Sequence, residues 1–380
     1  MIRNGEGDGK GGQGATASRG GADPAEAARL NDLRARIDAL DEQIVGLLNR
    51  RAEVALQIGR LKSQGESAVY QPDREAAVRR RVKEANRGPL SNDALVAIYR
   101  EILSASRALQ RKLRVAYLGP AGTFTHEAAR QHFGEAVEYV PANTVAAVFE
   151  EAQKGRVDFG VVAVENSTEG VVNHTLDLLL DSELKIRAEI RLPISHNLVC
   201  RGPLSEVRRV YSHPQAIAQS RRWLSQHLPE AELLEVSSTS LAAQMAASEA
   251  GAAAIATETA ARSFGLEVAA RGIEDASVNV TRFLVIGDEM ASRSGDDITS
   301  IVFSVANRVG ALHDALGVFQ RRGIDLTRIE SRPSKRKIWE YVFYVDAAGH
   351  PEDESLSGAL EELRSGASFL KILGAWPREG

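Results

Sequence analysis

The sequence predicts three folded regions: an all-helical region, an α/β region with two lobes, and a smaller α+β region. Three patterns predict this order. Apolar residues recur at helical spacing through residues 27–112, strand and helix patterns alternate through 113–290, and the order strand, helix, strand, strand, helix, strand fills 297–380. A length of 380 residues suits two or three domains.

The helical region is predicted from a long apolar seam. Its positions alternate by three and four residues for about four heptads, and Arg51 occupies the next seam position after Leu47. Lys62 closes the stripe. A cation facing a helical interior is costly unless an anion meets it. The seam therefore indicates a buried site for a small anion. A coiled-coil seam with one tolerated arginine, whose charged end reaches back to solvent, explains the pattern equally well. The seam residues are Leu33, Ile37, Leu40, Ile44, Leu47, Val54, Ile58 and Leu61.

Helix geometry predicts a dimer. Arg51 and Lys62 are separated by roughly 16 Å along the axis and about 20° around it, so both can reach one small ligand. Arg34 lies about 25 Å from Arg51 and roughly 100° round the helix. It can serve the same ligand only from a second copy. Two further helices, beginning at Pro72 and at Ser91 or Asn92, cannot bury so long a stripe, so we expect an intertwined dimer.

The α/β region gathers polar residues where strands should end. We expect parallel sheets, with ligands bound beyond the carboxyl ends of the strands. Polar segments occur at 119–125, 165–167, 212–219 and 279–283. Hydroxyls at helix starts are usually caps, but four such segments in one cleft favour a binding site. The expected strands are Arg114–Leu118, Val157–Val164, Val207–Tyr211, Ala231–Val236, Ala252–Ala256 and one that begins at Asn279.

The last region has the strand and helix order of a ferredoxin-like fold. It lacks a catalytic cluster of its own, so we expect a regulatory or dimerising role. The expected strands are Thr299–Val305, Ile324–Ser331, Ile338–Val345 and Phe369–Gly374, with helices over Gly310–Arg321 and Glu354–Ser365.

Composition excludes several classes. No apolar run approaches the roughly 20 residues of a membrane span. Residues 1–26 hold eight glycines and no apolar core, which indicates a disordered tail rather than a signal peptide. The single Cys200 fits a reducing cytoplasm. Residues 27–112 carry 17 Lys and Arg against 11 Asp and Glu, but these are interleaved with the seam and lack aromatic platforms, so nucleic-acid binding is disfavoured.

The motifs carry a resemblance to known families. Gly-Pro-Ala-Gly-Thr-Phe-Thr at 119–125, Glu-Asn-Ser at 165–167, Ser-His-Pro-Gln at 212–215 and Thr-Arg-Phe at 281–283 resemble the prephenate dehydratases. Residues 27–112 resemble the all-helical chorismate mutases, and Gly-Ala-Leu at 310–312 with Glu-Ser-Arg-Pro at 330–333 resembles the phenylalanine-binding ACT domain. All but the tail is covered, in the order of the bifunctional chorismate mutase–prephenate dehydratase family.

That resemblance implies a chemistry without a metal or cofactor. Chorismate would rearrange to prephenate by a pericyclic shift, with negative charge stabilised on the ether oxygen. Gln71 stands where some members carry an aspartate, so affinity or pH response is expected to differ. Lys62 and Gln110 would be catalytic, and the implied substrate contacts are Arg34 from the partner copy, Arg51, Lys62, Gln71, Arg74, Glu75, Ser106 and Gln110.

In the second implied reaction, prephenate would lose carbon dioxide and water to give phenylpyruvate. The resemblance assigns the proton donor to Thr281, whereas nothing in the spacing supports His126 or His213 in that role. Arg282 either holds a carboxylate or is structural. The implied substrate contacts are Thr123, Thr125, Glu165, Asn166, Ser167, Ser212, Gln215, Gln219, Thr281, Arg282 and Phe283.

Phenylalanine is the implied feedback inhibitor, bound in the last region. Deleting residues 297–380 is expected to leave catalysis and abolish inhibition. A non-catalytic amino-acid sensor, and an enzyme preferring the aminated analogue arogenate, are the alternatives, and the oligomer is expected to be a homodimer or larger. The implied regulatory residues are Asn307, Gly310, Ala311, Leu312, Glu330, Ser331, Arg332 and Pro333.

Overall fold

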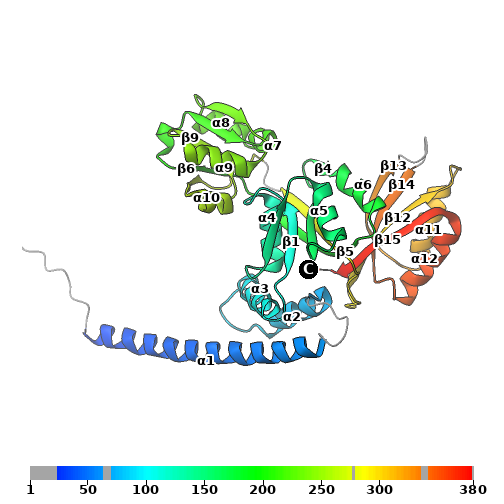
Figure 1. Ribbon diagram of the computed structural model, residues 1–380, viewed down its shortest axis with the longest axis horizontal. Helices are drawn as coiled ribbons and strands as arrows, with labels where there is room; N and C mark the ends of the chain where they lie inside the picture. The colour runs from blue at the N-terminus through cyan, green and yellow to red at the C-terminus, as the bar shows by residue number, and fades with distance from the viewer. Residues whose placement is uncertain (1–23, 63–69, 276–278, 335–340, 379–380) are drawn as a thin grey trace, which may run out of the picture. The chain divides into compact units, whose positions relative to one another are not determined.

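The computed structural model describes residues 24–62, 70–275, 279–334 and 341–378, and Figure 1 labels their helices and strands. The chain divides into two compact units, one through Val54 and the other from Ala55 onward. Of the expected tail, residues 1–23 lie outside the described residues.

Helix α1 runs over Pro24–Lys62, so it ends where the predicted stripe closes and begins nine residues before the first seam residue, Leu33. The predicted seam is exposed in the single chain: Leu40 retains 56% of its accessible surface and Leu47 retains 61%. Arg34 is exposed and Arg51 is half-buried. The side chain of Lys62 lies outside the described residues. Exposed apolar surface on this scale marks an interaction face.

Helices α2 (Pro72–Ala85) and α3 (Asn92–Ala108) begin where the sequence predicts. Pro72 occupies the first turn of α2, where its missing N–H costs nothing. The Ser91 hydroxyl caps α3 by accepting a hydrogen bond from the Ala94 N–H at 3.2 Å. The two helices pack together, and the Ser104 hydroxyl of α3 accepts from the Ala136 N–H at 3.2 Å, which fixes α3 to the first lobe.

The first lobe is a mixed sheet rather than the expected parallel one. Strand β1 pairs in parallel with β2 and β3, whereas β11 is antiparallel to both β3 and β5. The chain returns from the second lobe through β11, and that return reverses the strand direction. Helix α4 covers one face, and α5 and α6 cover the other. The elements are β1 (Arg114–Leu118), α4 (Phe124–Phe133), β2 (Glu138–Ala142), α5 (Val145–Gln153), β3 (Phe159–Asn166), β4 (Gly170–Val171), α6 (Asn173–Asp181), β5 (Lys185–Pro193) and β11 (Val280–Gly287).

The second lobe has its own five-stranded sheet in the order β10-β6-β9-β7-β8. Strand β7 is parallel to β8 and β9, whereas β6 is antiparallel to β9 and β10. Two apolar clusters pack on its faces. The elements are β6 (Asn197–Cys200), the 3₁₀ turn η1 (Leu204–Glu206), β7 (Arg209–Ser212), α7 (Pro214–Gln219), α8 (Arg221–His227), β8 (Glu232–Glu235), α9 (Thr239–Ser248), β9 (Ala252–Ala256), α10 (Glu258–Phe264) and β10 (Glu267–Ala270).

The third region has the predicted order of strands and helices. Its strands are antiparallel in the order β13-β14-β12-β15, and α11 and α12 pack on one face of them (Figure 1). The first residues of the expected strand Ile338–Val345 lie outside the described residues. The elements are β12 (Asp297–Val305), α11 (Ala311–Arg321), β13 (Leu326–Pro333), β14 (Tyr341–Ala348), α12 (Glu354–Gly366) and β15 (Ala367–Pro377).

The third region and the first lobe share one ten-stranded sheet and one apolar core. Strand β15 pairs in parallel with β5 at Gly374 and Ile186. Tyr344 and Trp376 are buried in the same cluster as Leu176, and the Tyr344 hydroxyl donates to the Leu176 carbonyl at 2.8 Å. Deleting residues 297–380 would expose this core. The deletion proposed from the sequence would therefore test folding rather than inhibition by phenylalanine.

Candidate active site

A cavity of about 850 Å³ lies between the two lobes. Its walls are formed by the carboxyl ends of β1 and β3 and by the beginnings of β11, α7 and α9. The sequence predicts a site at these strand ends. Of the polar residues expected at the site, the cavity is lined by Thr123, Thr125, Asn166, Gln215, Gln219 and Thr281; His196, His213, Glu169, Thr239 and Asn279 also line it.

The Gly-rich turn at 119–125 belongs to the first lobe and is hydrogen-bonded to the second. Gly122 has φ +86°, and a Cβ there would lie 3.1 Å from the Ala260 Cβ, so glycine is required for both conformation and space. The Thr257 hydroxyl donates to the Gly122 carbonyl at 3.0 Å, and the Ser240 hydroxyl donates to the Ala121 carbonyl. The turn of one lobe is therefore fixed by hydroxyls of the other.

Thr281 is paired with Asn166 at the cavity wall. The two residues face each other in the antiparallel register of β11 and β3, and the Asn166 Nδ2 donates to the Thr281 Oγ1 at 2.8 Å. Thr281 is 9% exposed. Because its oxygen already accepts a hydrogen bond, its own proton can be donated to a group in the cavity.

A chain of amides extends this pair into the second lobe. The Asn166 Nδ2 also donates to the Asn279 Oδ1 at 2.8 Å, and the Asn279 Nδ2 donates to the Gln219 Oε1 at 3.0 Å. The same Gln219 oxygen lies 2.8 Å from the His196 Nε2. The chain connects β3 and β11 of one lobe with α7 of the other, so it links the two walls of the cavity.

The orientation of the Asn166 amide is fixed by the following loop. Its Oδ1 accepts from the Thr168 N–H at 2.9 Å, the Thr168 hydroxyl at 2.6 Å and the Glu169 N–H at 3.1 Å. An amide oxygen held by three donors leaves the NH₂ group directed at Thr281. Sequence reasoning counted Asn166 among the substrate contacts but did not single out His196. Asn279 begins the polar segment 279–283 that the sequence assigns to the cleft, although it was not counted among the implied substrate contacts.

Comparison with known proteins identifies the three regions. Family models match residues 33–111 as chorismate mutase type II, residues 115–291 as prephenate dehydratase and residues 299–365 as an ACT domain. A bifunctional chorismate mutase/prephenate dehydratase from Aquifex aeolicus is 47% identical over 92% of this chain and 98% of its own length. The chain belongs to the bifunctional chorismate mutase/prephenate dehydratase family.

Other relatives agree with this assignment. The enzyme of the same name from Stutzerimonas stutzeri is 46% identical over 93% of this chain and 99% of its own length. Among solved structures, a prephenate dehydratase from Arthrobacter aurescens in complex with L-Phe is 36% identical, with a TM-score of 0.64 over 70% of this chain and 90% of that one.

Several dehydratase residues expected to contact substrate lie away from the cavity. The Ser212 hydroxyl is fully buried and donates to the Ile255 carbonyl at 2.8 Å. The Ser167 hydroxyl accepts from the Val280 N–H at 3.0 Å, and Phe283 is buried in the sheet core. Arg282 forms ion pairs with Glu165 at 3.0 Å and with two other carboxylates, which favours the structural alternative for it.

The two histidines weighed as general acids differ in position. Burial and the nearby Arg130 lower the pKa of His126 to about 4, and its Nδ1 accepts from the Gly122 N–H at 3.1 Å. A neutral imidazole acting as an acceptor cannot donate a proton from that atom. His213 lines the cavity and caps α7, its Nδ1 accepting from the Gln215 N–H at 3.3 Å.

The residues expected at the mutase site fall in both compact units. Gln110 packs against α1, because a Cβ at Gly59 would lie 2.7 Å from the Gln110 Cγ. Ser106 is buried one turn earlier, and its hydroxyl donates to the Ile102 carbonyl at 2.7 Å. Glu75, expected to meet substrate, is buried and forms an ion pair with Arg107. Gln71 occupies the position before α2 without a capping hydrogen bond from its side chain, and Arg74 is exposed. Arg34 and Arg51 belong to the first unit.

The expected regulatory residues of the ACT domain face two ways. Gly310 has φ +77° and caps α11, followed by Ala311 and Leu312 in its first turn. Arg332 turns toward the dehydratase region, where it pairs with Asp177 of α6 at 3.0 Å. It therefore does not lie with its neighbour Ser331, which is exposed on β13.

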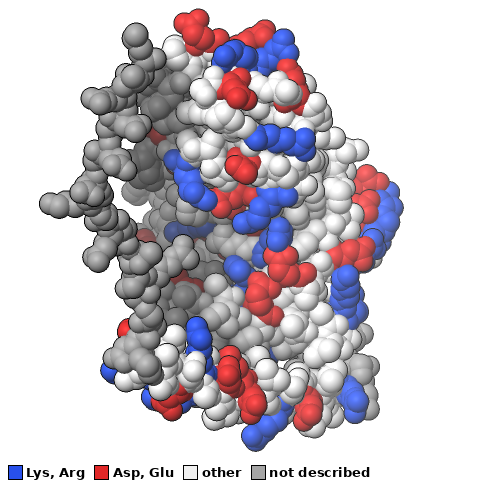
Figure 2. All heavy atoms as spheres, turned by 90° about the vertical axis from the view of Figure 1, so that its left-hand side faces the viewer, with Lys and Arg blue, Asp and Glu red and all other residues white. Residues whose placement is uncertain are grey.

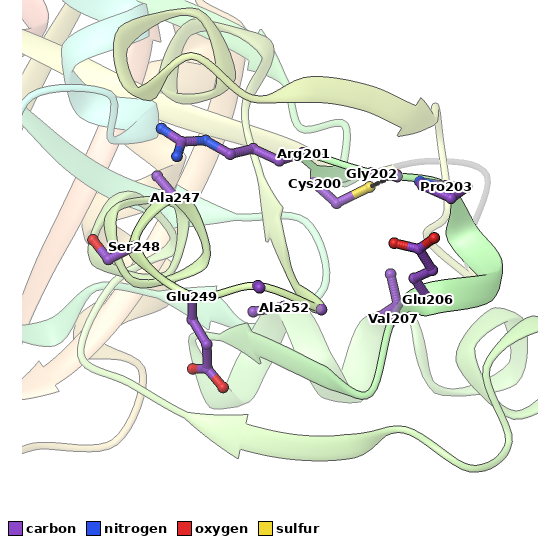
Figure 3. Close-up of a pocket in the computed structure, with 12 residues that line it drawn as sticks. Cys200, Arg201, Gly202, Pro203, Glu206, Val207, Ala247, Ser248, Glu249 and Ala252 are labelled. Carbon is purple, nitrogen blue, oxygen red and sulfur yellow. Dashed lines mark hydrogen bonds between the residues drawn. The ribbon is translucent and has the colours of Figure 1, made fainter.

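A smaller cavity of about 220 Å³ lies in the second lobe (Figure 3). The Cys200 thiol donates to the Gly202 carbonyl, and burial raises its pKa, which disfavours a reactive thiolate. Figure 2 shows basic and acidic side chains interspersed on one face of the molecule. Within the described ranges, no His, Cys, Asp or Glu cluster could hold a metal ion, and no helix is long and apolar enough to cross a membrane.

Proposed function

We propose that the helical region rearranges chorismate to prephenate and that the cavity between the lobes converts prephenate to phenylpyruvate. The observation that carries the second assignment is the Thr281–Asn166 pair on the wall of a cavity large enough for a small dicarboxylate. The matches to both catalytic families over most of the chain support the pair of activities.

In the dehydratase step, Thr281 gives its proton to the ring hydroxyl of prephenate. The bond between the ring and the departing carboxylate breaks, and its electron pair completes the aromatic ring. The carbon–oxygen bond breaks on the other side, so the hydroxyl leaves as water together with carbon dioxide. Asn166 stabilises the charge that develops on the Thr281 Oγ1, because its NH₂ group already points at that atom. Solvent then returns the proton to Thr281.

Helix starts and hydroxyls supply the anion-binding groups. The first residues of α4 and of α9 line the cavity from opposite lobes, including Thr125 and Thr239. Backbone N–H groups at a helix start favour negative charge. Because Thr123 and Ser238 already cap these helices, accepting hydrogen bonds from the His126 and Leu241 N–H groups, we assign the substrate carboxylates to Thr125 and Thr239.

Replacing Thr281 with valine tests the dehydratase assignment. Thr281→Val keeps the shape of the side chain and removes the donor, so turnover on prephenate should fall by about 100-fold or more, with little change in KM. Thr175→Val is the matched control, since the Thr175 hydroxyl is buried and donates to the Ala163 carbonyl on β3 at 2.7 Å. Turnover near the wild-type value in Thr281→Val would eliminate Thr281 as the donor and bring His213 forward.

For the mutase, we propose a site completed by a second copy of the chain. The exposed seam of α1 supports pairing of this kind, because a long apolar stripe is stable only when it is covered. Arg51, Lys62 and Gln110 would hold the carboxylates and the ether oxygen, and Arg34 would come from the partner. Glu75 can contact substrate only if its ion pair with Arg107 opens, so we assign it to positioning α2 on α3.

For control, we propose that phenylalanine binds the ACT domain at Asn307–Leu312 and at the exposed side of Glu330–Pro333. The strand order β13-β14-β12-β15 supports a ferredoxin-like fold for this domain, and the Arthrobacter aurescens relative was solved in complex with L-Phe. The site lies outside the cavity, so inhibition requires that phenylalanine favour one conformation of the enzyme over another.

The alternative substrate is arogenate, which carries an amine where prephenate carries a keto group. Its ring hydroxyl and ring carboxylate are the same, so Thr281 would serve both substrates. Turnover measured side by side on the two substrates decides between them. We further propose a cytoplasmic location, on the evidence of a single cysteine that is unpaired and buried.

A further inference from the structure

The cavity wall has a charged reverse side. Residues alternate between the two faces of a sheet, so Asn166 and Thr281 face the cavity, whereas their neighbours Glu165 and Arg282 face the other way. These two neighbours are also register partners, and the Arg282 Nη1 lies 3.0 Å from the Glu165 Oε2. The catalytic pair and this ion pair therefore share the same two strand ends.

The ACT domain contacts the reverse side directly. The Arg328 Nε of β13 donates to the Glu165 Oε2 at 2.9 Å. Arg282 is held in turn by Asp346 of β14 at 3.0 Å and by Glu189 of β5 at 2.7 Å. Burial would raise the pKa of Glu189, but the hydrogen bonds and charges of Arg282 and Arg191 lower it, so this carboxylate stays ionised.

A second contact lies four residues further along β13. Arg332 donates to the Asn173 side chain and pairs with Asp177, both on α6. Asn173 is the first residue of α6, directly after the Glu169–Val172 stretch of the cavity wall. Only 12% of the Arg328 side chain and 10% of the Arg332 side chain are exposed, so solvent and salt screen these contacts weakly.

Between them, the two arginines hold both ends of one segment. Residues 165–173 run from Glu165, held by Arg328, to Asn173, held by Arg332. The segment carries Asn166, whose amide is oriented by its own loop, and it carries the cavity wall at Glu169–Val172. Any shift of β13 acts on both ends of this segment together.

We propose that Arg328 and Arg332 are positioning residues for the dehydratase reaction, holding segment 165–173 so that Asn166 stays directed at Thr281. The inference rests on the proposed function of the cavity. Neither arginine lines the cavity, so each acts through the segment that it holds. A displacement of about 1 Å at a catalytic group can cost about 100-fold in rate, which sets the expected size of the effect.

The variants Arg328→Met and Arg332→Met remove the charge and keep most of the aliphatic stem. We expect dehydratase kcat to fall by about 10- to 100-fold while KM changes by less than about threefold. Mutase activity in the same chain should be retained, which serves as a folding control. Arg321→Met is the matched control, because Arg321 pairs with Glu362 within the ACT domain at 2.6 Å and contacts no part of the segment.

A double-mutant cycle separates positioning from general stabilisation. Asp177→Asn removes one of the two contacts that Arg332→Met removes, so the double variant should be hardly slower than Arg332→Met alone. Hydrogen exchange of the amides at 166–172 should quicken in the single variants and stay unchanged in Arg321→Met. If Arg332→Met also loses mutase activity, Asp177→Asn provides the same measurement with a smaller change.

Three outcomes decide the matter. A fall in kcat with faster exchange at 166–172 supports the inference. Wild-type kcat in Arg328→Met and Arg332→Met, or an equal fall in Arg321→Met, overturns it while leaving the proposed function intact. A wild-type enzyme without turnover on prephenate would instead refute the proposed function itself.

Discussion

The junction between β15 and β5 depends on a glycine. A Cβ on Gly374 would lie 2.2 Å from the Ile186 carbonyl oxygen and 2.5 Å from the Ile186 nitrogen. Both atoms belong to the backbone, so no side-chain rotation relieves the contact. Gly374→Ala therefore has to separate the two strands where the ACT sheet meets the dehydratase sheet.

The expected loss follows from this geometry. Ordinary Cβ contacts begin near 3.4 Å, so the strands must separate by about 1 Å in an interior that tolerates little extra volume. Overpacking of this kind costs about 1–3 kcal/mol, and each backbone hydrogen bond lost adds about 1 kcal/mol. We expect a destabilisation of about 2–5 kcal/mol and a fall in Tm on the order of 5 °C.

Calorimetry or circular dichroism against temperature measures this effect, with dehydratase turnover recorded alongside. Gly366→Ala is the matched control, because a Cβ at Gly366, the last residue of α12, would meet nothing within 4 Å. Its Tm should stay the same or rise slightly. An unchanged Tm in Gly374→Ala would refute the reasoning, since it would mean that β15 and β5 do not approach each other this closely.

Three further predictions concern the dimer, the pH dependence of stability and inhibition by phenylalanine. Mixing inactive Arg34→Ala protein with inactive Lys62→Ala protein should restore some mutase activity through one intact site per heterodimer; no recovery after verified subunit exchange would contradict the shared site. The pKa of His126 is about 4 in the folded chain and near 6.5 in the unfolded chain. As pH falls, the unfolded state therefore takes up the proton first, and the stability that is present above pH 6.5 is lost as pH falls toward 4. The Tm, measured at a series of pH values across that range, should fall less steeply with falling pH in His126→Gln than in the wild-type chain. Phenylalanine should bind the intact protein and inhibit the dehydratase, and calorimetry without binding heat at millimolar phenylalanine would end that proposal.

Local signals in the sequence predicted local features well. Pro72 and Ser91 predict the starts of α2 and α3 because a missing N–H and a capping hydroxyl act within one turn. The polar segments after β1 and β3 predict the cavity because strand ends of one sheet meet at one edge. Thr281 and Asn166 were placed there by family resemblance, and they lie together on its wall.

Long-range contacts escaped the sequence. Glu165 and Arg282 stand in the same motifs as Asn166 and Thr281, yet they face the opposite side, and only the register of β3 with β11 and the approach of β13 show this. Arg332 likewise belongs to a motif read as regulatory but contacts α6.

The sequence by itself determined the order of the regions, the helix starts and the residue types at the cavity, because periodicity, capping and turn chemistry act over a few neighbouring residues. The tertiary structure alone decided that the sheets are mixed, that the ACT and dehydratase sheets join at Gly374, and that Arg328 and Arg332 contact the two ends of segment 165–173. Those features depend on pairing between residues as far as 188 positions apart (Ile186 with Gly374), and the strand order that brings them together leaves no local pattern in the chain.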